Sequence, residues 1–211
     1  MKTKYLILIA LAFVATSCRK PQHEYLLNDE TKSWFVDDDK RYFEMRDDNG
    51  VGYSFSLERS YSYMMEESSH VMGILTDEAQ RESCSQSGNS SYAMAFLLCA
   101  TAGWGEELNM DDSFSLDLGN ARYALSMRGK EISPQYCLDL GGGVDEMKFE
   151  VEYFDQYRVH DVEYQSVMRL KLVDLAYPQS HFFPTEIYYA KHYGLIQCTL
   201  DDKLTLYRLP N

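Results

Sequence analysis

The sequence has few basic residues for its size, and this limits the partners it can have. Its 20 Lys and Arg stand against 33 Asp and Glu, which gives a formal net charge of −13. Nucleic-acid binding depends on clustered Lys and Arg that neutralise phosphates, so the composition argues against a nucleic-acid partner. The chain has 211 residues, 45% of them hydrophobic. That fraction is too high for a disordered chain and is typical of one globular domain.

Motifs for common catalytic, nucleotide and metal sites are also missing. There is no Gly-x-Ser-x-Gly nucleophile elbow, and Gly141-Gly142-Gly143 lacks the GK[ST] of a phosphate loop. The five histidines include no HxH or HxxxH pair, and the cysteines form no CxxC. Asp37-Asp38-Asp39 lacks the alternating ligands and the Gly of a calcium loop. We therefore expect no cofactor, no metal site and no enzymatic activity.

Only one long apolar run is present, and it lies at the N-terminus. Tyr5–Val14 has ten uncharged apolar residues, whereas a membrane-spanning helix needs about 20. Lys2 and Lys4 precede this run, and the small residues Ala15-Thr16-Ser17 follow it. This layout predicts that residues 1–17 are a secretory signal peptide.

The segment Ala15-Thr16-Ser17-Cys18 resembles the lipobox of bacterial lipoproteins. The resemblance implies that Cys18 is the lipidation site, with the signal cut just before it and acyl chains inserted in a membrane. Such anchors are stable, at about 0.8 kcal/mol for each buried methylene. Ala15 stands where Leu is usual, so an ordinary signal-peptidase cut after Ser17 stays open. Arg19 follows the Cys where Asp would imply inner-membrane retention, so the resemblance implies the outer membrane, on its periplasmic or exposed side.

The residues that follow Cys18 are predicted to connect the membrane anchor to the domain. Loss of 1–17 removes two Lys and no acid, so the mature net charge is 18 − 33 = −15. Anionic head groups repel such a body, which we expect to be held near the membrane rather than flat on it. We expect 18–32 to be the lipidated Cys and a tether, in which the 13 flexible residues 19–31 would reach roughly 20 Å. Residues 33–211 are predicted to form a single domain.

Alternation of apolar and polar residues recurs along this domain. It predicts antiparallel strands over 51–57, 114–118, 147–153 and 162–172. After Glu58-Arg59-Ser60, Tyr61, Tyr63 and Met65 continue the meander. Asp47-Asp48-Asn49-Gly50 is a strong hairpin turn. The 17 Tyr and 10 Phe also favour strands. We predict a mainly β fold: a single domain of twisted antiparallel sheet, as a meander, partial barrel or sandwich, with few short helices.

Three segments give other or weaker signals. Asp77–Glu82 suits a short helix, and 87–91, with Ser87-Gly88 and Ser90-Ser91, reads as a polar turn. Tyr92–Ala102 has helix-forming residues without a polar face, so a helix and a strand buried on both sides both stay open, and we favour the strand.

Part of the C-terminal region resembles a known group of proteins. Thr185–Lys191 followed by Gly194-Leu195-Ile196, with Glu163–Val167 before them, is similar to the last hairpin of uncharacterised Gram-negative envelope lipoproteins. The resemblance implies a curved sheet or partial barrel. It covers about 40 residues and carries no catalytic motif.

The body has four cysteines: Cys84, Cys99, Cys137 and Cys198. An exported protein meets an oxidising compartment, where four cysteines allow three disulfide pairings. All four are therefore possible disulfide members. Cys198 lies on the apolar face of its predicted strand, so a buried free thiol is the alternative there.

One group of acids deserves comparison with an enzyme. Glu150 and Glu152 lie on one face of a predicted strand, with Asp155 just beyond. The pattern loosely resembles the acidic strand, Glu-x-Asp-x-x-Glu, of β-sandwich glycosidases that hydrolyse β-glucans. Retaining glycosidases hold two carboxyls about 5–5.5 Å apart, which neighbours on a strand face can supply. The second and third acids depart from that pattern, and the alternative is a solvated strand of an acidic protein.

Three functions are compatible with these features. The one we favour is a non-catalytic, lipid-anchored envelope protein that binds a protein or glycan partner or serves the cell surface. The second is a small-ligand or glycan binder that uses the concave face of the sheet and its many aromatic residues. The third is a glycoside hydrolase built on Glu150, Glu152 and Asp155.

Overall fold

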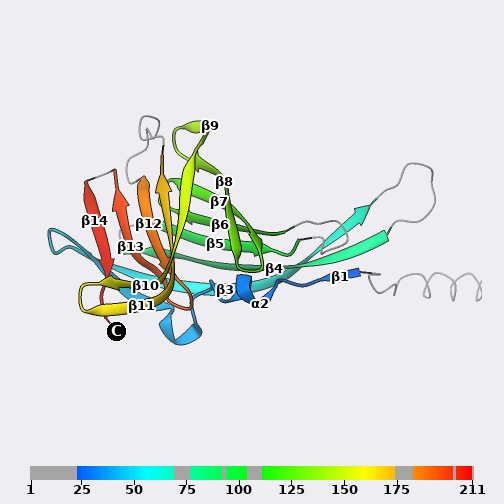
Figure 1. Ribbon diagram of the computed structural model, residues 1–211, viewed down its shortest axis with the longest axis horizontal. Coiled ribbons are helices and arrows are strands. Elements are labelled where there is room, and N and C mark those ends of the chain that lie inside the picture. Colours follow the sequence, from blue (N-terminus) through cyan, green and yellow to red (C-terminus); the bar gives the residue numbers. More distant parts are fainter. Residues whose placement is uncertain are drawn as a thin grey trace, which may run out of the picture.

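Fourteen β-strands form one sheet that curves round until it nearly closes (Figure 1). The computed structural model describes residues 23–68, 77–91, 94–103, 111–173, 183–201 and 203–210. The strands are β1 (His23–Tyr25), β2 (Tyr42–Asp47), β3 (Gly52–Ser68), β4 (Asp77–Ser90), β5 (Ala95–Thr101), β6 (Asp112–Leu118), β7 (Ala121–Arg128), β8 (Glu131–Asp139), β9 (Gly143–Met147), β10 (Phe149–Val159), β11 (Val162–Leu172), β12 (Pro184–Ala190), β13 (Gly194–Leu200) and β14 (Leu204–Arg208). Two short helices, α2 (Asp29–Lys32) and the 3-10 helix η1 (Asp38–Lys40), precede β2. The predicted mainly β, antiparallel single domain is confirmed.

The strands form two meanders, β2 to β9 and β10 to β14, which are joined by the pairing of β14 with β2. Their order is β10-β11-β12-β13-β14-β2-β3-β4-β5-β6-β7-β8-β9, and β1 lies parallel to β4. The last strand, β14, pairs with β2, where Leu206 lies opposite Asp47. The remaining gap separates β8 and β9 from β10, although only Lys148 links β9 to β10 in the sequence. Of the expected versions of the fold, the partial barrel is the one observed.

The segments predicted as strands are strands. Three of them fall in one strand each: 51–57 in β3 apart from Val51, 114–118 in β6, and 162–172 as β11. The fourth, 147–153, is broken at Lys148. Its burial pattern fails at Tyr153, which is 42% exposed, because β10 borders the gap and has no strand beside it there.

The predicted short helix over 77–82 and the predicted turn over 87–91 are wrong, because β4 runs through to Ser90. The inward positions of β4 include the buried polar residues Glu82 and Gln86, so the sequence shows no apolar alternation. β4 is a strand because it pairs with β3 on one side and with β5 on the other. Over 92–102, where both a helix and a strand were possible, the structure has a strand over 95–101.

The predicted tether over 18–32 is wrong from His23 onward, while Cys18 itself lies outside the described residues. β1 pairs with β4, and the chain then enters the interior of the curved sheet. There Trp34, Phe35 and Val36 are at most 2% exposed and share one hydrophobic core with the inward side chains of the strands. An N-terminal segment therefore fills the space that side chains alone fill in narrower barrels.

Asp112, on β6, holds helix α2 against the sheet through its buried residue Thr31. Its carboxylate accepts hydrogen bonds from the amide and the side chain of Asn28, at 3.1 and 2.7 Å, and from the Thr31 hydroxyl at 2.7 Å. It also accepts from the amide of Gly103 at 3.0 Å. Asn28 in turn caps α2 by accepting from the amide of Thr31. Helix α2 is thus joined to the sheet through one buried carboxylate, that of Asp112.

Glu82 and Gln86 of β4 bind the same segment on either side of α2. Glu82 accepts from the amide of Leu27 and pairs with the ammonium group of Lys32, both at 2.9 Å. Gln86 accepts from the amide of Val36 at 2.9 Å and donates to its carbonyl at 3.1 Å. These inward polar residues are the reason that β4 lacks an apolar face.

A second, smaller core lies on the outer face of the sheet. The β10–β11 hairpin leaves the wall near Ser166, which has φ 52°, and folds back over β12 to β14 (Figure 1). The ring of Tyr157 stacks on Tyr188 with centroids 4.4 Å apart. The buried members of this core are Val159, Tyr164, Val167, Tyr188, Ala190 and Ile196. As a result, β12 and β13 are covered on both faces.

β3 and β4 also project from the barrel as a long hairpin, which we call the arm (Figure 1). Their register continues without a shift to Ser68, opposite Asp77. β1 adds a third strand to the arm, with His23 beside Ala79. Tyr61, Tyr63 and Met65 lie in a strand, as predicted, but this strand is the outer half of β3, which runs unbroken through residues 58–60 and lies outside the barrel wall.

We expect Asp112→Ala to lower the free energy of unfolding by about 2–4 kcal/mol, because it leaves several buried donors without an acceptor. Urea unfolding followed by tryptophan fluorescence measures the change. The neighbouring Asp111→Ala is the control. Asp111 pairs with exposed Arg128 and with Ser126, which can turn to water, so its loss should be far smaller. Equal losses for the two variants would contradict the role given to Asp112.

Candidate functional site

The acidic strand carries its carboxylates on the solvent side of the sheet. Glu150 and Glu152 lie on one face of β10, as predicted, and both are exposed. Glu150 lies opposite Lys171 on β11. Asp155 is exposed as well and lies where the pairing with β11 is interrupted. The structure therefore brings two of the three acids together, at the rim of the gap and not in a closed cleft.

Arg169 neutralises one of these acids. Its guanidinium donates to Glu152 at 2.7 Å and to Glu186 on β12 at 2.5 Å. Partial burial opposes the charge of Arg169, but the hydrogen bonds to the two carboxylates outweigh it and raise the pKa of that side chain. A general acid needs the opposite surroundings, in which burial or a second acid keeps the carboxyl protonated. Glu152 instead is exposed and forms an ion pair with Arg169.

The four cysteines of the domain are free thiols, so the disulfide expected as one alternative is not formed. Cys99 pairs with Ser85, the neighbour of Cys84, which puts the two cysteines on opposite faces of the sheet. Burial raises the pKa of Cys84 to about 11 and those of Cys137 and Cys198 to about 12. Thiols with such pKa values are poor nucleophiles at neutral pH.

The concave face of the sheet, expected as a ligand surface, is occupied. Its inward side chains and the N-terminal segment form one continuous hydrophobic core in the described part of the chain. The reason is the segment around Trp34, which the sequence did not reveal as an interior element. A ligand site has to be sought on the outer face.

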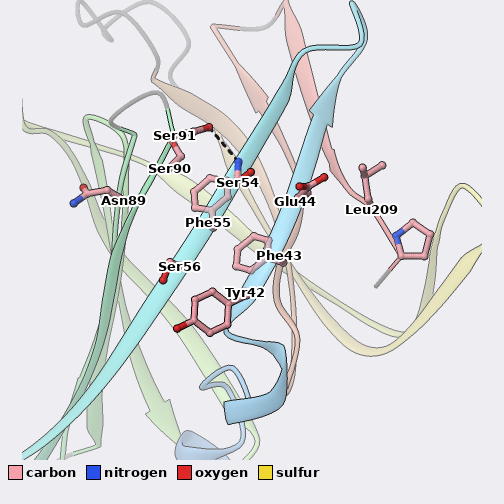
Figure 2. Close-up of a pocket in the computed structure, with 11 residues that line it drawn as sticks. Tyr42, Phe43, Glu44, Ser54, Phe55, Ser56, Asn89, Ser90, Ser91 and Leu209 are labelled. Carbon is pink, nitrogen blue, oxygen red and sulfur yellow. Dashed lines mark hydrogen bonds between the residues drawn. The ribbon is translucent and has the colours of Figure 1, made fainter.

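Figure 2 shows a hollow of about 650 Å³ on that outer face, over β2, β3 and β4. Two rows of side chains cross the strands: Leu209, Glu44, Ser54 and Ser91 form one, and Tyr42, Ser56 and Asn89 form the other. The rows are roughly 7 Å apart, which is the distance between same-face neighbours on a strand. Pro210 completes one wall.

The residues around the hollow combine an aromatic platform with hydrogen-bonding groups. Tyr42 is 70% exposed, the highest value among the large apolar side chains of the described residues. The floor offers hydroxyls from three serines, the Asn89 amide and the Glu44 carboxylate. The Ser91 hydroxyl already accepts from the amide of Ser54 at 3.2 Å. A flat apolar face next to donors and acceptors suits a small polar ligand with its own hydroxyl groups.

Sequence reasoning missed this hollow. The exposed tyrosine was visible as Tyr42 in the alternation before the Asn49-Gly50 turn, but its neighbours come from β4 and from the C-terminus. Only the β14–β2 pairing brings Leu209 beside Glu44, whose carbonyl accepts its amide at 2.8 Å.

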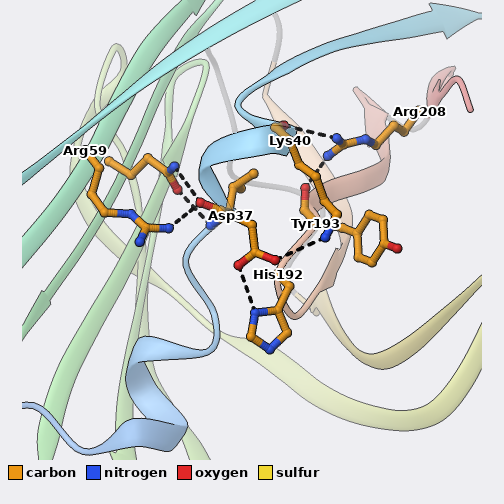
Figure 3. A network of polar contacts seen from close by, with 8 residues as sticks. Asp37, Lys40, Arg59, His192, Tyr193 and Arg208 are labelled. Atoms are coloured by element: carbon orange, nitrogen blue, oxygen red, sulfur yellow. Dashed lines mark hydrogen bonds and ion pairs between the residues drawn. The ribbon is translucent and has the colours of Figure 1, made fainter. Parts of the chain in front are cut away.

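A polar network surrounds the 3-10 helix η1 (Figure 3). Asp37 accepts from Lys40 at 3.1 Å and pairs with His192 at 3.0 Å. Arg208, only 3% exposed, donates to the carbonyl groups of Tyr193 and Lys40. Burial lowers the pKa of Arg208 to about 10, so the guanidinium still carries its charge at neutral pH. The network fastens η1 to the β12–β13 turn and to β14, and we regard it as structural.

Comparison with protein-family models, curated proteins and solved structures gives no match for this chain. Within the described ranges, no helix has both the length and the apolar character needed to cross a membrane. Nor do three or more His, Cys, Asp or Glu side chains of those ranges meet as metal ligands would.

The double substitution Glu150→Gln and Glu152→Gln tests the acidic strand. Both side chains are exposed, so we expect the free energy of unfolding to change by about 0.5 kcal/mol or less. Chemical denaturation measures stability, and release of reducing sugar from a β-glucan measures hydrolysis. Hydrolysis by the unmodified protein that disappears in the double variant would support the glycosidase reading instead.

Proposed function

We propose that this protein is a lipid-anchored component of a bacterial cell envelope whose barrel-like domain is a non-catalytic binding or accessory module. The anchor would be Cys18, with export through the signal peptide 1–17 and placement at the outer membrane. The non-catalytic part of the proposal is supported by the exposed, charge-paired state of the acidic strand and by the high pKa values of the buried thiols.

The course of β1 is the observation that supports an anchor best. Cys18 precedes His23 by five residues, which span at most roughly 18 Å. β1 runs parallel to β4, from the outer end of the arm toward the barrel. His23 is therefore the end of β1 that faces the outer end of the arm, and an acylated Cys18 would attach the membrane on that side of the molecule.

The arm then serves as a spacer between membrane and barrel. From Leu57 to Ser68 the strand rises by roughly 36 Å, at about 3.3 Å per residue. The chain is acidic, and anionic head groups repel it. A stiff three-stranded arm holds the barrel away from those head groups, which the flexible tether expected from the sequence would do less well.

Cys18→Ser tests the anchor. Expressed with its signal in a Gram-negative host, the variant should move from the membrane fraction to the soluble fraction, and it should lose incorporation of a labelled palmitate analogue. Cys99→Ser, which alters a half-buried thiol of the domain, should stay with the membranes. If the Cys18 variant still sediments with membranes after a high-salt wash, the anchor proposal is wrong.

A second candidate function, glycan binding, is favoured by the hollow in Figure 2. The ring of Tyr42 can stack on a sugar face while Glu44 and Asn89 bind its hydroxyls. The site differs from the concave face considered first, because that face is filled by the core. The hollow also falls within the 300–1,000 Å³ usual for ligand pockets.

Screening against an array of neutral oligosaccharides tests the second function. We expect Tyr42→Ala to weaken binding of the best glycan at least tenfold by calorimetry, because the stacking surface is lost. Tyr63→Ala, at a similarly exposed tyrosine on the arm, should leave that affinity unchanged. Absence of any binder, or equal affinity of Tyr42→Ala and the unmodified protein, would count against a glycan site in the hollow.

A further inference from the structure

The outer half of β3 has one edge without a partner strand. β3 pairs with β2 only as far as Ser56, and the last backbone contact on that side runs from the amide of Leu57 to the carbonyl of Arg41. From 58 to 68 the strand pairs with β4 alone. In the described part of the chain, no backbone hydrogen bond is made on the other edge of these eleven residues.

The geometry fixes which backbone groups are unpaired. The amide of Leu57 points to the open side, and strand backbone groups repeat with period two. The odd-numbered residues 59–67 therefore direct their N–H and C=O groups to this edge. A row of such groups is a template for another strand.

The open edge of β3 lacks the features that prevent strand pairing. Ser60–Met65 contains no charge and no proline, and the register with β4 shows no bulge. Tyr61, Tyr63 and Met64 are 55%, 56% and 44% exposed. The nearest cation, Arg59, is turned inward, where it donates to the Val36 carbonyl (Figure 3). With its uncharged and aromatic centre, this edge is suited to pairing.

The strand edges at the gap in the barrel, unlike the edge of the arm, carry residues that prevent pairing with another strand. β8 has Pro134 on the rim of the gap, and β10 has Glu150 and Glu152 there. Proline removes a donor, and charges oppose pairing with a further strand. The strand edges at the gap are thus protected against pairing with a further strand, while the edge of the arm is not.

We propose that β3 of the arm pairs antiparallel with β3 of a second copy of this chain, around a twofold axis at Tyr63. Tyr63 is the midpoint of the free stretch 58–68, so this register pairs all eleven residues. Each odd-numbered residue meets an odd-numbered one, which supplies about ten backbone hydrogen bonds and makes the two arms one continuous sheet.

Charge favours the same register. With Tyr63 on the axis, none of the acidic residues Glu58, Glu66 and Glu67 lies opposite another in the register. No two like charges face each other along the paired stretch. A register shifted by two residues, which puts Ser62 on the axis, would place Glu58 opposite Glu66. An identical strand therefore complements this edge over its full length, and for this reason we favour a second copy over another protein.

The two acidic bodies repel at long range, so salt should strengthen the dimer. Because the Debye length shrinks from about 30 Å at 0.01 M to about 8 Å at 0.15 M salt, the repulsion is largely screened at physiological ionic strength. We expect the dimer dissociation constant to fall at least several-fold over this range.

Sedimentation velocity of the mature chain carrying Cys18→Ser, free of detergent, tests the proposal whether or not Cys18 is lipidated. The protein should dimerise in the micromolar range. Tyr63→Lys alone and Tyr63→Glu alone should be monomers, since each new charge faces its own copy across the axis. An equimolar mixture of the two should restore a dimer, and Leu140→Lys, at an exposed position in the turn after β8, should dimerise normally.

Cross-linking tests the register. Paired residues on the axis have Cα atoms about 5.5 Å apart, within disulfide range, so Tyr63→Cys should form a covalent dimer on mild oxidation. Tyr61→Cys should not, because Tyr61 lies opposite Met65 of the other copy. A monomer up to the high micromolar range, or a dimer that persists in Tyr63→Lys and Tyr63→Glu, would overturn the proposal.

Discussion

The fold depends on filling a sheet that is too wide to be filled by its own side chains. Barrels of about eight strands close around their inward residues, whereas this sheet has thirteen strands along its path. The N-terminal segment supplies the missing volume with Trp34, Phe35 and Val36. Its backbone enters an apolar interior and needs buried partners, which Asp112, Glu82 and others provide. The sheet and the N-terminal segment therefore stabilise each other. Without the segment the interior of the sheet would not be filled, and without the sheet the backbone of the segment would lack its buried partners.

This filling decides where recognition can occur. A hollow interior could have bound a ligand, but here it is packed with side chains of the chain itself. What remains are the outer face, the strand edges and the arm. The outer face is further reduced where the β10–β11 hairpin covers β12 and β13. Among the described residues, the exposed Tyr42 hollow and the open edge of the arm are two places where recognition can occur.

The sequence predicted those parts of the fold in which one face of a strand is apolar. β6 and β11 follow that rule, and their alternation was visible. It failed on β4, because Glu82 and Gln86 face inward to bind a segment about 50 residues earlier, and no local pattern records that contact. The same contact explains why polar residues after His23 looked like a tether.

The candidate site was predictable only in part, for a similar reason. The acids of β10 were correctly placed on one face, but the cation that neutralises Glu152 comes from β11 and is shared with β12. The Tyr42 hollow needs residues from both ends of the chain. Properties that arise from strands distant in sequence cannot be read from the spacing within one strand.

The pairing of β14 with β2 also has a consequence for how the chain folds. Leu206 and Asp47 are partners across almost the whole length of the domain, and Lys191 binds Glu30. Contacts between such distant positions give a high contact order, and loop-closure entropy must be overcome before they form. The barrel therefore cannot be completed until its last strand has been synthesised and, in an exported chain, translocated. During that interval β2 and its uncovered interior are open to chaperones and to other unfinished chains.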